Sequence, residues 1–113
     1  MILFPWKLVR DNVPDQIRAR GANILVKQLD GKKYREALAV KLIEEAREVG
    51  EARDRQSLIN ELADLEETMD AYRISNGLPL QEIRKARLIK YAKAGGFGKG
   101  FFLYLIYGFK ARK

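Results

Sequence analysis

The strongest pattern in the chain is a helical repeat of apolar residues over two long stretches, about residues 32–53 and 55–75. Apolar side chains recur there at spacings of three and four residues, which places them on one face of a helix. The first stripe contains Leu38, Leu42, Val49 and Ala52, and the second contains Leu58, Leu62, Leu65, Met69 and Tyr72. Polar residues at 53–56 interrupt the repeat, and Asp54 is a suitable N-cap for the second stretch. The pattern predicts two antiparallel helices joined by a short turn.

Weaker signals predict the elements before this hairpin. Asp11 or Asn12 can cap a short helix that begins near Pro14 and ends near Arg20. Residues 24–26, Ile-Leu-Val, are typical of either a short strand or an extended connector.

Turn-forming residues divide the end of the chain. Gly77 is placed to end the second long helix in a left-handed conformation, and Pro79 can open a third helix that runs to about Ala94. A glycine-rich turn at residues 95–100 follows, and then an apolar, aromatic tail at residues 101–113 with a basic end.

These elements predict one all-α domain over residues 1–113, an antiparallel helical bundle with short extended pieces near the termini. Three long helices enclose only a thin core, so we expect a homo-oligomer, most simply a dimer that completes the bundle. The tail exposes too much apolar surface to be left free. It can form an oligomer contact, or it can fold back on its own subunit against residues 2–6.

The composition of the chain excludes several kinds of site and of cellular setting. The 113 residues carry a net charge of +7 and contain neither cysteine nor histidine, which excludes disulfides, thiolate nucleophiles and zinc–thiolate sites. No stretch approaches the roughly 20 apolar residues of a membrane span, and residues 1–6 lack the basic leader of a signal peptide. We therefore expect a cytoplasmic protein without a membrane partner.

Two pairs of acidic residues depart from the apolar pattern. Glu45 and Glu48 are three residues apart, as are Glu61 and Asp64, so both acids of a pair point to one side of a helix. With Leu38 as the reference, Glu45 lies at roughly −20°, inside the first stripe. Burying a carboxylate costs several kcal/mol unless it is paired or binds a cation.

In an antiparallel hairpin the two pairs face each other at about the same level. Four carboxylates in one layer are typical of a site for a hard cation, Mg²⁺ or Mn²⁺, with Glu45, Glu48, Glu61 and Asp64 as ligands. We expect no internal cation at that level, so the acids should repel one another without metal. Alternatively these acids lie on solvated helix faces, as most acids at this spacing do.

Three segments resemble one known superfamily. Two acidic segments follow each other in the chain: residues 41–48, Lys-Leu-Ile-Glu-Glu-Ala-Arg-Glu, and residues 60–65, Asn-Glu-Leu-Ala-Asp-Leu. Together they resemble the acidic signature of the all-α nucleoside triphosphate pyrophosphohydrolases. That superfamily includes the MazG proteins and phosphoribosyl-ATP pyrophosphohydrolase. Residues 7–14, Lys-Leu-Val-Arg-Asp-Asn-Val-Pro, and 94–97, Ala-Gly-Gly-Phe, are similar to segments of its small house-cleaning branch. The chain departs from that branch at Asn12, at Ala94 and in the tail.

The resemblance implies Mg²⁺-dependent hydrolysis of a nucleoside triphosphate, or a related pyrophosphate, between the α- and β-phosphates. It implies Glu45, Glu48, Glu61 and Asp64 as metal ligands, with Glu44 and Glu45 as the catalytic carboxylates. Glu44 would orient or deprotonate the water, although it points away from the stripe. Candidate contacts for the substrate phosphates are Lys7, Arg10, Arg87, Lys90 and Lys93.

Each of these basic side chains can instead be an ordinary surface charge. Trp6 and Tyr72 can stack on a base, but both also suit an apolar core. A different class of function also fits the composition. A small basic helical dimer can bind nucleic acid, or act as a regulatory or assembly module, without catalysis.

Overall fold

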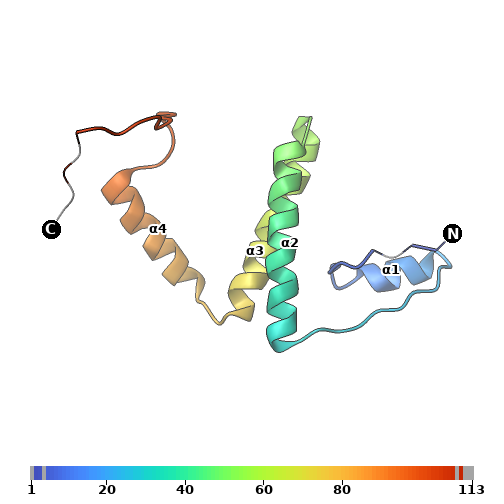
Figure 1. Ribbon diagram of the computed structural model, residues 1–113. Coiled ribbons are helices and arrows are strands. Elements are labelled where there is room, and N and C mark those ends of the chain that lie inside the picture. The colour runs from blue at the N-terminus through green and yellow to red at the C-terminus, as the bar shows by residue number, and fades with distance from the viewer. Residues whose placement is uncertain (1, 4, 109, 111–113) are drawn as a thin grey trace. The chain divides into compact units, whose positions relative to one another are not determined.

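The computed structural model describes residues 2–3, 5–108 and 110, and these contain four helices and no strand (Figure 1). The helices are α1 (Val13–Ala19), α2 (Gly31–Glu51), α3 (Arg55–Ser75) and α4 (Leu80–Ala94). The prediction of an all-α protein is confirmed for this part of the chain, and each helix lies within two residues of its predicted bounds. Residues 22–30, where a strand or a connector was expected, are an extended connector.

The chain divides into two compact units, residues 1–79 and 80–113. The prediction of one domain over residues 1–113 remains a prediction, as do the bundle of MazG type and its completion by dimerisation.

The first unit is built on the α2–α3 hairpin, whose two helices pack along each other (Figure 1). Asp54 begins α3 as predicted, because its carboxylate accepts a hydrogen bond of 2.8 Å from the Ser57 backbone N–H. Gly77 ends α3 at φ 67°, and the N–H groups of Gly77 and Leu78 donate to the carbonyls of Ile74 and Arg73. This is the Schellman arrangement, which needs a left-handed residue after the helix.

The hairpin buries little apolar surface. Leu38 is the only buried apolar residue in the part of the chain that the structure describes. Leu58, Leu62 and Met69, which belong to the predicted stripe of α3, are 40%, 46% and 54% exposed. The stripe therefore faces α2 only in part, and most of its outer edge meets solvent.

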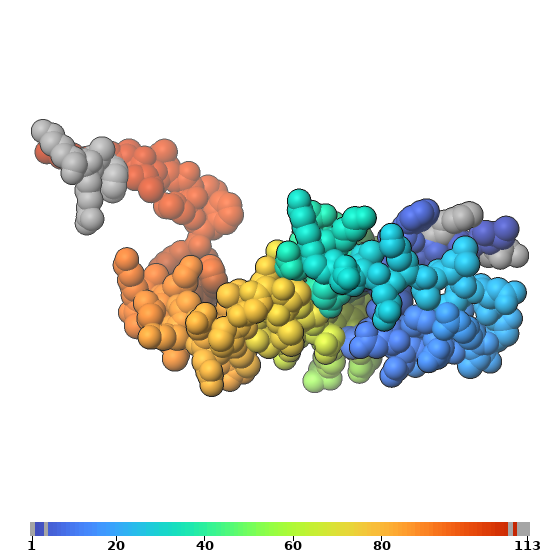
Figure 2. Space-filling model, turned by 90° about the horizontal axis from the view of Figure 1, so that it is seen from below, coloured from blue at the N-terminus to red at the C-terminus, as the bar shows by residue number. Residues whose placement is uncertain are grey.

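The N-terminal segment lies along α2. Trp6, Lys7 and Leu8 line one side of a hollow of about 180 Å³ whose other side is formed by α2 residues, including Lys41 and Glu44. Figure 2 shows the N-terminal segment in blue next to the cyan atoms of α2. Asn12 stands at the N-cap of α1, but its side chain makes no capping hydrogen bond.

The second unit consists of α4 and the segment that follows it. None of its described residues is buried, and the aromatic side chains of the tail are 76–90% exposed from Phe101 to Tyr107. The predicted third long helix is therefore present, whereas the two alternatives for the tail remain open. Residues 109 and 111–113 of the tail, and residue 4 of its alternative contact, lie outside the described residues.

Candidate metal centre

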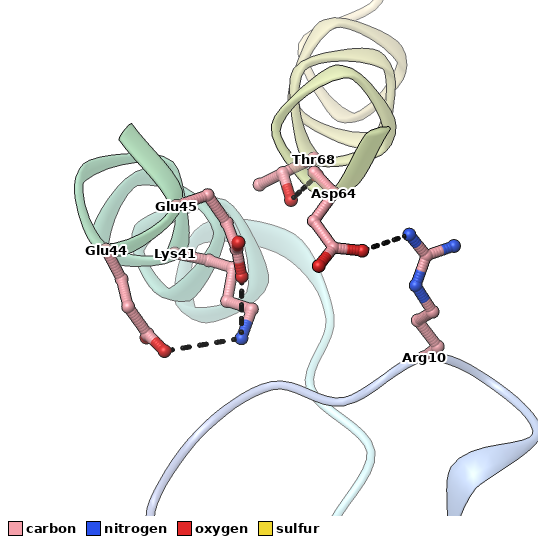
Figure 3. Close-up of polar contacts among 6 residues, drawn as sticks. All are labelled: Arg10, Lys41, Glu44, Glu45, Asp64 and Thr68. Carbon is pink, nitrogen blue, oxygen red and sulfur yellow. Dashed lines mark hydrogen bonds and ion pairs between the residues drawn. The ribbon is translucent and has the colours of Figure 1, made fainter. Parts of the chain in front are cut away.

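Three of the four predicted metal ligands converge between α2 and α3. Glu45 comes from α2, and Glu61 and Asp64 come from α3, one turn apart. Each offers a carboxylate oxygen, and these atoms lie within 4.8 Å of one another. Figure 3 shows Glu45 and Asp64 projecting from the two helices into the space between them. This group could hold a metal ion.

Glu45 is the most constrained of the three. It is only 5% exposed. Its Oε2 atom and Oε2 of Glu61 are buried, and neither has a hydrogen-bond partner within the part of the chain that the structure describes. Burial raises the pKa of the Glu45 carboxyl, the nearby Glu48 and Asp64 carboxylates add to the rise, and Lys41 opposes it. A buried carboxylate oxygen without a donor is costly, and a bound cation would satisfy it.

Two side-chain cations accompany these acids, contrary to the expectation of an uncompensated cluster. Lys41 Nζ lies 3.3 Å from Glu45 Oε1 and 3.6 Å from Glu44 Oε1. Arg10 Nη2 donates a hydrogen bond of 2.7 Å to Asp64 Oδ1, and this pairing raises the pKa of Arg10. The expectation was wrong because it considered the acids alone. Lys41 lies one helical turn before Glu44 and Glu45. Arg10 belongs to a segment that is 54 residues from Asp64 in the sequence.

The remaining predicted acids lie beside the three. Glu44 points toward Lys41 and away from α3 (Figure 3). Glu48 is half-buried and, with Glu61, lines an open hollow of about 540 Å³ near the turn between the helices. Glu48 is not part of the group whose oxygens lie within 4.8 Å, so its role as a fourth ligand remains a prediction.

The predicted phosphate contacts fall into two sets. Arg10 reaches the acidic group through Asp64, and Lys7 lines the hollow that also contains Lys41. Arg87, Lys90 and Lys93 are exposed on α4 in the second unit. Of these five predicted phosphate contacts, only Arg10 forms an ion pair with a candidate metal ligand in the described part of the chain.

Sequence reasoning missed two side chains at this site. Lys41 stands three and four residues before Glu44 and Glu45, and that spacing alone predicts ion pairs on a helix. Thr68 is buried, and its hydroxyl donates 2.8 Å to the Asp64 backbone carbonyl, one turn earlier in α3. The apolar pattern of the sequence does not indicate this hydrogen bond of Thr68.

The donor set decides which ion would fit. It consists of carboxylate oxygens, two of them buried and without partners, and the chain has no thiolate or imidazole to offer. Such a set suits a hard divalent cation that keeps some of its water.

In the described part of the chain no helix is both long and apolar enough to cross a membrane.

A scan against protein-family models and searches of curated proteins and of solved structures find no match to this chain.

Proposed function

We propose that the protein hydrolyses a nucleoside triphosphate, or a related pyrophosphate, between the α- and β-phosphates, giving a monophosphate and pyrophosphate. One observation carries the proposal: carboxylates from two helices converge, and two of their buried oxygens have no hydrogen-bond partner among the described residues. The acidic segments that resemble the all-α nucleoside triphosphate pyrophosphohydrolases contain these same residues. We therefore propose membership of that superfamily, in its MazG-like branch.

Glu45, Glu61 and Asp64 would hold Mg²⁺, or Mn²⁺ in its place, and Glu48 would be a fourth ligand. The ion supplies neutralisation of the phosphate charge and a more acidic bound water. Because the chain contains no histidine, a carboxylate must take the proton from the attacking water, and Glu44 is our candidate. Phosphate transfer requires mainly positioning and charge from the protein, which these side chains provide.

The substrate phosphates need cationic contacts beyond the ion. Arg10 is the best placed, since it already reaches Asp64, and Lys7 borders the adjoining hollow. Arg87, Lys90 and Lys93 follow one another at helical spacing on α4 and would add positive charge for a polyanion.

We also propose that the working form is a homo-oligomer, most simply a dimer. The exposed apolar edge of α3 and the exposed aromatic tail support this, because a stable monomer rarely leaves such surfaces in water.

The test is a panel of nucleotides assayed for pyrophosphate and monophosphate, with and without Mg²⁺ or Mn²⁺. We expect release of both products only with metal, and a loss of several orders of magnitude in Glu61→Gln. Glu66→Gln is the matched control, because Glu66 is an exposed acid on the same helix. Metal-independent turnover, or equal turnover in the two variants, would contradict the proposal.

A second candidate function rests on the charge of the second unit. Residues 80–113 contain nine lysines and arginines and one glutamate, so this unit carries +8, next to exposed aromatic side chains. Basic and aromatic groups together suit a single-stranded nucleic acid. That function predicts a mobility shift of DNA or RNA that weakens steeply with salt and needs no divalent metal.

A further inference from the structure

Two of the three candidate metal ligands already hold a cation of the protein itself. Asp64 is bound by Arg10 at 2.7 Å, and Glu45 is bound by Lys41 at 3.3 Å (Figure 3). Glu61 makes no ion pair in the described part of the chain, and its buried Oε2 has no partner. A divalent ion entering this group would therefore compete with Arg10 and Lys41 for the same carboxylates.

Neither protein cation depends wholly on the carboxylate that it now contacts, because Arg10 is exposed to water and Lys41 has a second acceptor. The Arg10 and Asp64 side chains are 58% and 42% exposed, and an ion pair in such contact with water is weak. Lys41 has a second acceptor, because Glu44 Oε1 lies 3.6 Å from its Nζ atom. Lys41 can therefore leave Glu45 and keep a partner, while the guanidinium of Arg10 can turn away without leaving water.

We propose that Arg10 and Lys41 are resident counter-ions that a divalent ion displaces, and that the freed side chains then bind the polyphosphate. This inference rests on the proposed function. It adds that the metal binds before the polyphosphate, and that the binding of one strengthens the binding of the other. Without metal, the two cations neutralise the acidic group. With metal, Arg10 gives up Asp64 and Lys41 gives up Glu45 and keeps only Glu44, so both cations can turn to the anion that the metal also attracts.

The consequence is cooperative binding. Each divalent ion that displaces the two cations raises the affinity of the site for polyphosphate, and by linkage polyphosphate raises the affinity for the ion. Lys41 thereby gains a role as a positioning and substrate-binding residue, in addition to its contact with Glu45.

The experiment measures Mn²⁺ affinity by calorimetry on the protein of residues 1–113, first alone and then with inorganic pyrophosphate. The variants are Arg10→Gln and Lys41→Gln. The controls are Arg18→Gln and Lys32→Gln, because Arg18 pairs with Asp15 at 3.1 Å in the N-terminal segment and Lys32 pairs with Glu36 at 3.8 Å on α2. The controls remove the same charge from exposed pairs away from the acidic group.

We expect Arg10→Gln and Lys41→Gln to bind Mn²⁺ alone several-fold more tightly than wild type, since the competing cation is gone. The same variants should bind pyrophosphate in the presence of Mn²⁺ about tenfold more weakly, which equals about 1.4 kcal/mol. A merely structural role would weaken both. The controls should stay near wild type in both measurements, and Arg10→Lys should preserve much of the coupling.

The possible failures are distinct. Wild-type protein that binds no Mn²⁺ overturns the proposed function and this inference together. Wild-type protein that binds Mn²⁺, with Arg10→Gln binding it equally or less tightly, overturns this inference and leaves the proposed function standing. Circular dichroism checks the helix content of each variant. If Lys41→Gln does not fold, Arg10→Gln decides the question, because Arg10 is exposed and lies outside the helices.

Discussion

The two units of the chain differ in charge and in burial. Residues 1–79 carry 13 lysines and arginines and 14 aspartates and glutamates, so their net charge is −1, whereas residues 80–113 carry +8. The first unit contains the buried residues Leu38, Glu45 and Thr68, and the second has none among its described residues. The excess of positive charge thus belongs to the unit in which no described residue is buried.

This difference separates two kinds of chemistry. A part-buried group of carboxylates such as Glu45, Glu61 and Asp64 could hold an ion in a fixed position, because the group is built on two packed helices. A set of exposed cations acts through charge, which attracts polyanions over a distance and is screened by salt. The first unit is therefore where substitutions should change metal binding, and the second is where they should change affinity for anions.

The strongest test of this comparison is Glu45→Gln. The substitution keeps the size of the side chain and removes a charge whose burial is unfavourable, as the raised pKa of Glu45 indicates. We expect turnover to fall by several orders of magnitude, because the ion loses a ligand. We also expect the metal-free melting temperature to stay the same or rise.

The matched control for this variant is Glu66→Gln, an exposed acid on α3. It should retain most of the activity and show no gain in stability. If Glu45→Gln turned over substrate at the wild-type rate, or lost stability without metal, the acid would have a structural role.

Metal itself should stabilise the first unit. Ligands that bind only the folded state add about 2.7 kcal/mol at a hundredfold excess over Kd. For a unit of this size that corresponds to roughly 10 °C or more in melting temperature. Thermal unfolding with Mg²⁺, Mn²⁺ or a chelator measures the effect, which Glu45→Gln should largely remove. A wild-type melting temperature indifferent to both metals would speak against the site.

Much of this fold could be predicted because its signals are local. The apolar period, Asp54 before α3 and Gly77 after it depend on residues within a turn or two of each other. Burial could not be predicted as well, since the stripe shows which face is apolar but not what covers it. Leu62 and Met69 belong to the stripe and remain about half exposed.

At the site, the pairing of acids across the hairpin followed from the antiparallel arrangement, and Glu45, Glu61 and Asp64 do converge. The position of Arg10 followed from no local rule, because its contact with Asp64 spans 54 residues. The ion pairs of Lys41, in contrast, follow from a local rule, because Lys41 stands three and four residues before Glu44 and Glu45.

The exposed tail gives a further test, on assembly. If it forms an oligomer contact, Phe102→Ser with Tyr104→Ser should shift the mass measured by light scattering from about twice 13.0 kDa toward 13.0 kDa. The two rings lie 5.1 Å apart, edge to face, and both side chains are largely exposed. A wild-type mass of 13.0 kDa at micromolar concentration would show that the tail does not mediate self-association.

The basic face of α4 should affect affinity more than chemistry. Replacing Arg87, Lys90 and Lys93 together by glutamine should raise KM for a triphosphate up to about tenfold, as the loss of one to a few charge-assisted contacts implies. Mn²⁺ affinity should not change, because the ligands are in the other unit. The control for net charge replaces Arg84, Lys85 and Lys99 together by glutamine, because this removes the same three charges from exposed positions of the same unit. Equal KM effects in both sets would indicate general electrostatic attraction and no specific contact.

The smallest effect we predict concerns the cap that begins α3. The Asp54 carboxylate accepts a hydrogen bond from the Ser57 backbone N–H, and this bond lowers the pKa of Asp54 below its ordinary value. Asp54→Ala should therefore lower the melting temperature at pH 7 by a few degrees, and Asp54→Asn should lower it less, since an amide oxygen can still accept the bond. Hydrolysis should change little in either variant, because Asp54 is outside the acidic group.

The stabilisation by the Asp54 cap should depend on pH, and the lowered pKa of Asp54 sets the direction of that dependence. A carboxyl whose pKa is lower in the folded protein contributes stability above its unfolded pKa, ordinarily near 3.8, and loses that contribution as the pH falls through the folded value. The difference in melting temperature between wild type and Asp54→Ala should thus be constant near neutral pH and shrink below about pH 4. The difference between Asp54→Asn and Asp54→Ala should not shrink, because neither side chain titrates. A gap between wild type and Asp54→Ala that widened in acid would mean that the carboxylate is not what caps the helix.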